Sequence, residues 1–85
     1  MYRITFKPSA HKELLQVPKS AVKKIVIAID RLVENPRPMG VKKLKGTKED
    51  LYRIRVGDYR VIYTVDDVIR IVNIRRIGDR KDIYD

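Results

Sequence analysis

Hydrophobic and polar residues alternate with a period of two at both ends of the chain and follow a helical period between them. The segment "YRITFK", Tyr2 to Lys7, alternates and contains aromatic and β-branched residues before Pro8. We therefore expect a strand there. From Leu51 onward the period returns to two, which predicts three further strands joined by short turns.

Two helices are expected between these regions. Ser9 can cap a short helix that runs to about Gln16, and Pro18 stands where a proline is tolerated in the first turn of a second helix. That second helix should reach about Glu34, before "NPRPMG" stops it. The lysine-rich stretch 42–50 is expected to be a solvated loop. The apolar stripe of the second helix comprises Ala21, Val22, Ile25, Val26, Ile29, Leu32 and Val33.

This order of elements predicts a single α+β domain over residues 1–85. We expect an antiparallel four-stranded sheet with a two-helix hairpin packed on one face, in the order β-α-α-β-β-β. A chain of 85 residues is near the lower size limit for a domain that one hydrophobic core stabilises without disulfides or a structural metal. It has no cysteine, so disulfides and thiolate metal ligands are excluded.

The turns predict how the last three strands pair. Gly57-Asp58 fits a two-residue hairpin loop with glycine first, as a type II′ turn requires. Asp66-Asp67 is taken as a second two-residue turn. The first turn makes Arg55 oppose Arg60, Ile54 oppose Val61 and Tyr52 oppose Tyr63; the second makes Ile62 oppose Ile71, Val61 oppose Val72 and Arg60 oppose Asn73.

This register gathers arginines on one face of the sheet. The face toward the helices holds the apolar residues, including Val68, Val72 and Ile74. Opposed like charges are unfavourable by roughly 0.2–1 kcal/mol, so a missing anionic ligand is one explanation for the pattern. Exposed arginines that are screened by salt or paired with acidic side chains are the other. The arginines on the open face are Arg53, Arg55, Arg60 and Arg75.

Charge supports a polyanionic partner. Lys and Arg total 20 against 11 Asp and Glu, a formal net charge of +9. The cations of residues 51–85 are almost all arginine, whose planar fork binds phosphate through two hydrogen bonds.

Few catalytic side chains are available. The one histidine, His11, falls in the first helix, and no P-loop, Ser-His-Asp order or zinc-ligand spacing occurs. Chemistry on this face would therefore use Arg, Lys or Tyr. Such groups can cleave RNA by stabilising the transition state while the substrate's own 2′-hydroxyl attacks. The longest apolar run has five residues, so no membrane span and no signal peptide are expected.

Two segments carry a family resemblance. "KLKGTKEDLYRIRVGDYRVIY" followed by "IVNIRRIGDRKDIYD" resembles the RelE/ParE toxin superfamily, most closely its RelE branch. The resemblance implies a cytoplasmic toxin of a type II toxin–antitoxin system that cuts mRNA in the ribosomal A site, needs no metal or cofactor, and is neutralised by a cognate RelB-like antitoxin. Two alternatives stay open: a ParE-like toxin that inhibits DNA gyrase, and an inactive homologue that only binds an antitoxin.

The resemblance also implies site residues. Arg60 matches the hairpin arginine that contacts the scissile phosphate, and Arg80 matches a tail arginine that stabilises charge or protonates the leaving group. Tyr84 matches the tail tyrosine that orients the substrate and helps to activate the 2′-hydroxyl. Arginine cannot lose its proton at working pH, so where some members have lysines only electrostatic roles are open. Those positions are Arg53 and Arg55, and the residues expected to hold the RNA backbone are Lys43, Lys45 and Arg75.

Overall fold

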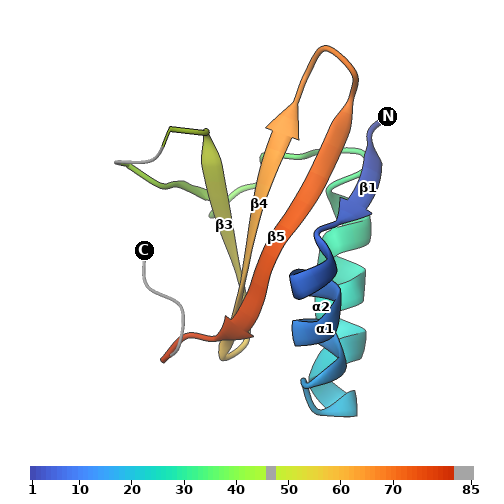
Figure 1. Cartoon of the computed structure of the whole chain (residues 1–85), viewed down its shortest axis with the longest axis vertical. Helices are drawn as coiled ribbons and strands as arrows, with labels where there is room; N and C mark the ends of the chain where they lie inside the picture. The colour runs from blue at the N-terminus through green and yellow to red at the C-terminus, as the bar shows by residue number, and fades with distance from the viewer. Residues whose placement is uncertain (46–47, 82–85) are drawn as a thin grey trace.

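The computed structural model describes residues 1–45 and 48–81 and shows one sheet with two helices on one side (Figure 1). The strand order is β1-β5-β4-β3-β2. The N-terminus lies beside the β4–β5 turn (Figure 1). The elements are β1 Arg3–Phe6, α1 Pro8–Leu15, α2 Lys19–Arg31, β2 Lys42–Lys43, β3 Leu51–Val56, β4 Tyr59–Asp66 and β5 Ile71–Asp79.

The α+β class and the helix pair agree with the sequence prediction, but the prediction of a four-stranded antiparallel sheet was wrong. The sheet has five strands and is mixed, because β1 pairs parallel with β5, Arg3 opposite Ile71. No local signal marks a pairing between the first and last strands. The fifth strand, β2, lies in the stretch expected to be a loop and pairs antiparallel with β3. Lysines suit such an edge strand because their charge discourages pairing with other chains.

The helix boundaries also differ in detail. α1 begins at Pro8, and no side chain caps it, so Ser9 lies in its first turn and is not the cap. Pro18 is the residue before α2 instead of a first-turn residue, and α2 ends at Arg31, short of Glu34. Ile25 and Ile29 of the expected apolar stripe of α2 are buried against the sheet, as predicted. Val26 is 39% exposed, so its place in that stripe was wrong.

The first hairpin has the predicted register, with Arg55 opposite Arg60 and Tyr52 opposite Tyr63. Gly57 has a φ of 60°, and Asp58 is not among the residues with positive φ, which fits the predicted turn with glycine first. A residue without a Cβ adopts this backbone conformation without steric cost. The pairing of β3 with β4 is therefore fixed by the turn.

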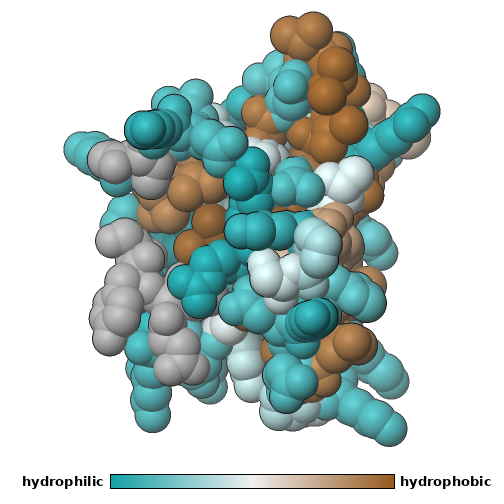
Figure 2. Space-filling view, in the orientation of Figure 1, coloured by the Kyte–Doolittle hydropathy of each residue, from teal (hydrophilic) through white to brown (hydrophobic). Residues whose placement is uncertain are grey.

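The second hairpin does not have the predicted register. Asp66 pairs with Ile71, so the loop has four residues, 67–70, and Arg70 adopts a φ of 60°. The Asp66 carboxylate accepts hydrogen bonds from the backbone N–H groups of Val68 and Ile69, which holds this wider loop. Val68 was expected on the core face but is 91% exposed at the tip. Figure 2 shows apolar side chains gathered at this end of the molecule.

A β-bulge further shifts the pairing of β4 with β5. Ile62 pairs with Arg76 while Tyr63 pairs with Ile74, so Arg75 is the additional residue on β5. The bulge turns Ile77, which is 1% exposed, back toward the core in place of Arg76. As a result Arg60 opposes Gly78, and the prediction that it opposes Asn73 was wrong.

Candidate nucleic-acid interface

Arg53, Arg55 and Arg60 lie on the sheet face opposite the helices. Their strand neighbours Ile54 and Val61 belong to the buried core, and side chains alternate between the two faces of a strand. The same alternation from Ile74 places Arg75 on this face. The structure thus brings the four arginines to the face on which the sequence placed them.

Arg55, Arg60 and Arg80 meet at a small pocket. With Gly57 and Tyr59 they line a space of about 90 Å³. We call this space the arginine pocket. Arg80 reaches it because its backbone N–H donates a hydrogen bond of 2.9 Å to the carbonyl oxygen of Asp58 in the turn. The chain leaving β5 is therefore fixed against the β3–β4 turn.

Arg53 lies deeper than the other arginines of this face, with 5% of its surface exposed. Burial lowers the pKa of its guanidinium, and the charges of Arg55 and Arg60 lower it further. The positive charges on this face are thus close enough to raise one another's energy. An anion placed among them would relieve that cost.

Arg75 differs because an acidic side chain lies next to it. Its Nη2 donates to Oε1 of Glu49 at 3.0 Å, and the side chain remains 31% exposed. It lies at the bulge of β5 and not among the residues that line the arginine pocket. Arg75 is therefore separate from the arginines that converge on the pocket.

The lysines lie on and beside β2. Lys43 pairs with Asp50, Nζ to Oδ1, at 3.3 Å, and Lys45 is exposed next to the strand. Sequence reasoning missed Lys42, which opposes Arg53 across the β2–β3 pair. Directly opposed residues project from the same face, so Lys42 adds a cation to the arginine face. Only the register of a two-residue strand could have revealed this. Tyr84 lies outside the described residues.

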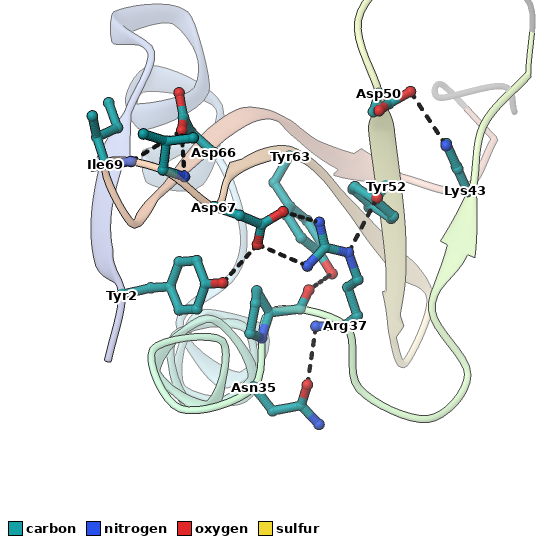
Figure 3. A network of polar contacts seen from close by, with 12 residues as sticks. Tyr2, Asn35, Arg37, Lys43, Asp50, Tyr52, Tyr63, Asp66, Asp67 and Ile69 are labelled. Atoms are coloured by element: carbon teal, nitrogen blue, oxygen red, sulfur yellow. Dashed lines mark hydrogen bonds and ion pairs between the residues drawn. The ribbon is translucent and has the colours of Figure 1, made fainter.

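A second polar cluster surrounds Arg37 (Figure 3) and contacts β3 at Tyr52, near the end of the strand away from the β3–β4 turn. Arg37 donates to both carboxylate oxygens of Asp67 at 3.1 and 2.8 Å, and its Nε donates to the Tyr52 hydroxyl at 3.2 Å. The Tyr2 hydroxyl donates to Asp67 at 2.6 Å. The cluster therefore ties the loop after α2 to β3, to the β4–β5 turn and to Tyr2, the residue before β1.

These contacts shift the acidity of the groups involved. Hydrogen bonds from Arg37 and then from Tyr2 lower the pKa of Asp67 to about 2. Burial raises the pKa of Tyr63, whose hydroxyl donates to the carbonyl oxygen of Pro36 at 2.7 Å. Sequence reasoning missed Arg37 because it stands in "NPRP", which was interpreted only as a helix stop. The geometry assigns it a structural role.

Within the described ranges 1–45 and 48–81, no three acidic or histidine side chains gather in a group that could hold a metal ion. Neither described helix is long and apolar enough to cross a bilayer.

Comparison with known proteins identifies the family to which this fold belongs. A family model described as "ParE toxin of type II toxin-antitoxin system, parDE" matches residues 4–84. "Putative toxin RelE1" of Methanocaldococcus jannaschii is 42% identical over 78 residues, covering 86% of this chain and 83% of that protein. "Toxin RelE" of Mycobacterium tuberculosis is 33% identical over 84 residues, covering 98% and 86%.

Solved structures of related toxins have a similar fold. The archaeal RelE-RelB complex from Pyrococcus horikoshii superposes with a TM-score of 0.82 at 35% identity, covering 96% of this chain and 98% of that chain. The intact E. coli RelBE toxin-antitoxin complex gives a TM-score of 0.81 at 26% identity, covering 93% and 96%. The fold and the match over nearly the whole chain define a toxin of a type II toxin–antitoxin system. The chain belongs to the RelE/ParE toxin superfamily, and the two curated relatives described above are named as RelE toxins.

Proposed function

We propose that this toxin is a ribosome-dependent endoribonuclease that cleaves mRNA in the A site. The observation that carries the proposal is the arginine pocket, where Arg55, Arg60 and Arg80 converge beside a fixed turn. Three guanidinium groups around a small space suit a phosphate, because each can donate two parallel hydrogen bonds to its oxygens. The relatives named RelE support assignment to the nuclease branch.

The proposed reaction uses the substrate's own nucleophile. The 2′-oxygen of the nucleotide before the scissile bond attacks phosphorus, the bond to the 5′-oxygen breaks, and a 2′,3′-cyclic phosphate and a 5′-hydroxyl remain. Arg60 contacts the scissile phosphate, and Arg55 and Arg80 stabilise the negative charge that builds up in the transition state. Arg53, which is more deeply buried on the same face, adds to the positive electrostatic potential at the phosphate. Because arginines stay protonated, these residues act as cations and not as bases.

The proton transfers need other groups. We assign Tyr84 to orient the substrate and to help activate the 2′-hydroxyl, with Arg80 next to the leaving oxygen. Tyr84→Phe should reduce cleavage less than Tyr84→Ala if stacking is its main role, and equally if its hydroxyl is needed. The toxin has few catalytic side chains with which to orient its substrate. The ribosome would therefore hold the mRNA so that the 2′-oxygen is in line with the bond that breaks. Lys43, Lys45 and Arg75 would hold the RNA backbone at the edge of the site.

We further propose a RelB-like antitoxin as the partner, acting in the cytoplasm where ribosomes translate. The solved complexes of RelE relatives with RelB support it, as does the net charge of +9, which favours an acidic binding segment.

The rival function is inhibition of DNA gyrase, which the name of the matching family model favours. Two assays on the purified toxin separate the functions. Ribosomes programmed with a defined message are incubated with the toxin, and primer extension maps new 5′ ends. In parallel, gyrase supercoiling is measured. New ends within A-site codons support the nuclease; intact message together with inhibited supercoiling would replace it with the gyrase function, and no effect in either assay would indicate an inactive homologue.

A further inference from the structure

The end of β5 lies beside the β3–β4 turn (Figure 1) and is held there by contacts of several kinds. The Glu13 carboxylate of α1 accepts a hydrogen bond of 3.0 Å from the Ile77 N–H, which fixes β5 to the helix layer at that residue. Gly78 follows and pairs with Arg60 of β4. Glycine permits more backbone conformations than any other residue, so the direction of the chain beyond Gly78 depends on the contacts that come after it.

Two hydrogen bonds hold the peptide units on either side of Arg80. Its own N–H donates to the carbonyl oxygen of Asp58 at 2.9 Å. The N–H of Lys81 donates to Oδ1 of Asp79, also at 2.9 Å. Because a peptide unit is planar, these bonds fix the two planes that meet at the Cα of Arg80. The planes set the direction of its Cα–Cβ bond, and the side chain of Arg80 lines the arginine pocket.

Arg80 depends on this support more than the other two arginines of the pocket do. Arg55 and Arg60 lie within paired strands, whereas Arg80 is exposed and follows the last residue of β5. An arginine side chain has many rotamers, and a backbone that also moved would spread its guanidinium over a larger volume. The position of the Arg80 guanidinium therefore depends on the local contacts of its own backbone.

We propose that Asp79 is a positioning residue that acts through Arg80 in the cleavage reaction. The inference deepens the proposed function and rests on it. Asp79 lines a neighbouring cavity of about 330 Å³ and is not among the residues that line the arginine pocket. Its carboxylate holds the Lys81 N–H, and this contact keeps the guanidinium of Arg80 where negative charge develops on the phosphate. A displacement of about 1 Å in such a group can cost a factor of about 100 in rate.

Three substitutions separate the hydrogen bond of Asp79 from its charge. Asp and Asn side chains can bond to the backbone two residues further on, so Asp79→Asn keeps the acceptor and removes the charge. Asp79→Glu keeps the charge but moves the oxygens one methylene away from the backbone, and Asp79→Ala removes both. We expect the Asn variant to cut message on the ribosome at the wild-type rate, and the Glu and Ala variants at least about tenfold more slowly.

The loss should be in the rate of the cleavage step and not in binding of the message. In single-turnover cleavage, the maximal rate constant should fall while the toxin concentration for half-maximal rate stays as in the wild type, because Arg80 acts in the transition state. Arg80→Ala provides the second arm. Adding Asp79→Ala to it should cause no further loss, since a residue that acts through Arg80 has no effect once that side chain is gone.

Asp66→Ala is the matched control. The Asp66 carboxylate accepts hydrogen bonds from the N–H groups of Val68 and Ile69, at the opposite end of β4 from the arginine pocket. This variant therefore loses the same kind of turn contact at a distance from the site. It should cut message as the wild type does, and urea unfolding of both alanine variants measures how much stability each contact contributes.

Two measurements on the toxin alone keep this outcome separate from that of the proposed function. Hydrogen exchange of the Arg80 amide should be slow in the wild type and in Asp79→Asn, and faster in Asp79→Ala and Asp79→Glu. The rise in Tm that inorganic phosphate causes at constant ionic strength should be smaller in the same two variants. If the wild type cuts no message while both measurements follow this pattern, the nuclease assignment fails and the positioning role stands.

Four results would overturn the role of Asp79. One is wild-type exchange at the Arg80 amide together with a wild-type phosphate effect in Asp79→Ala. The second is a loss in Asp79→Asn as large as that in Asp79→Ala, which would show that the charge matters and the hydrogen bond does not. The third is an equal loss of cleavage in Asp66→Ala, and the fourth is a further loss when Asp79→Ala is added to Arg80→Ala.

Discussion

Arg55 and Arg60 face each other across the β3–β4 hairpin, and both line one small pocket with Arg80. The turn at Gly57-Asp58 fixes the first two, and the hydrogen bond from Arg80 N–H to Asp58 fixes the third. The fold itself thus holds three cations close together before any ligand binds. Preorganised charge of this kind stabilises a transition state without reorganisation at the moment of reaction.

Replacing Arg60 should separate activity from folding. Arg60→Ala removes a cation from the arginine pocket, and we expect cleavage on the ribosome to fall by about 100- to 1,000-fold. The free energy of unfolding should change by no more than about 1 kcal/mol, because the Arg60 side chain lies on the sheet face opposite the buried core. Single-turnover cleavage and urea unfolding measure the two quantities.

Arg3→Ala is the matched control for this change, since Arg3 is an exposed strand arginine on β1. It should leave cleavage unchanged. Equal losses of activity in both variants would show that net charge matters and that the arginine pocket does not.

An inorganic anion should bind the arginine pocket and stabilise the folded toxin. At a phosphate concentration about five times its dissociation constant, mass action adds about 1 kcal/mol to the free energy of unfolding. For a chain of this size that raises Tm by about 4–8 °C. Thermal unfolding of the wild type and of Arg60→Ala at constant ionic strength measures the effect. The same rise in both proteins would place the anion elsewhere.

Gly57 should be more important for cleavage than another glycine with a similar backbone. Gly57 and Gly40 have φ values of 60° and 89°, and a Cβ on either would meet no atom within 4 Å. Alanine at either position should therefore cost about 1–2 kcal/mol of stability through backbone strain alone. Only Gly57→Ala should also reduce cleavage, because Gly57 sets the spacing of Arg55 and Arg60. Comparable activity in the two variants would contradict this role of the turn.

The Arg37–Asp67 pair should make the free energy of unfolding depend on pH in the acidic range. The pKa of Asp67 is about 2 in the folded protein, below the value of 3.8 for an unperturbed carboxyl. A depressed folded pKa stabilises the fold above the unfolded value, and that contribution is lost as pH falls toward the folded one. The free energy of unfolding of the wild type should thus decrease between about pH 4 and pH 2 more than that of Asp67→Asn.

Urea unfolding across this pH range measures the difference. Asp30→Asn, a change at an exposed position on α2, should follow the wild type. Parallel curves for the wild type and Asp67→Asn would show that the pair does not couple protonation to folding.

Prediction from the sequence succeeded where a local feature, such as a tight turn, determines the pairing of the strands. Gly57 sets one turn, so every pair of the first hairpin and the common face of Arg53, Arg55 and Arg60 followed. The second hairpin was misjudged because Asp66 caps a four-residue loop, which a pair of aspartates does not reveal. The bulge at Arg75 and the parallel pairing of β1 with β5 depend on long-range packing. The pocket that unites Arg80 with the hairpin depends on a backbone hydrogen bond that no sequence pattern marks.

Cleavage of a message with one modified nucleotide tests the central claim most directly. Two mRNAs are placed in the ribosomal A site, one all-ribose and one with a single 2′-deoxynucleotide before the scissile bond. We predict that the wild-type toxin cuts the first at that bond and leaves the second intact, and that Arg60→Ala cuts the first about 100- to 1,000-fold more slowly. Cleavage of the deoxy-substituted message, or of the all-ribose message by Arg60→Ala at the wild-type rate, would contradict the proposed role of the arginine pocket.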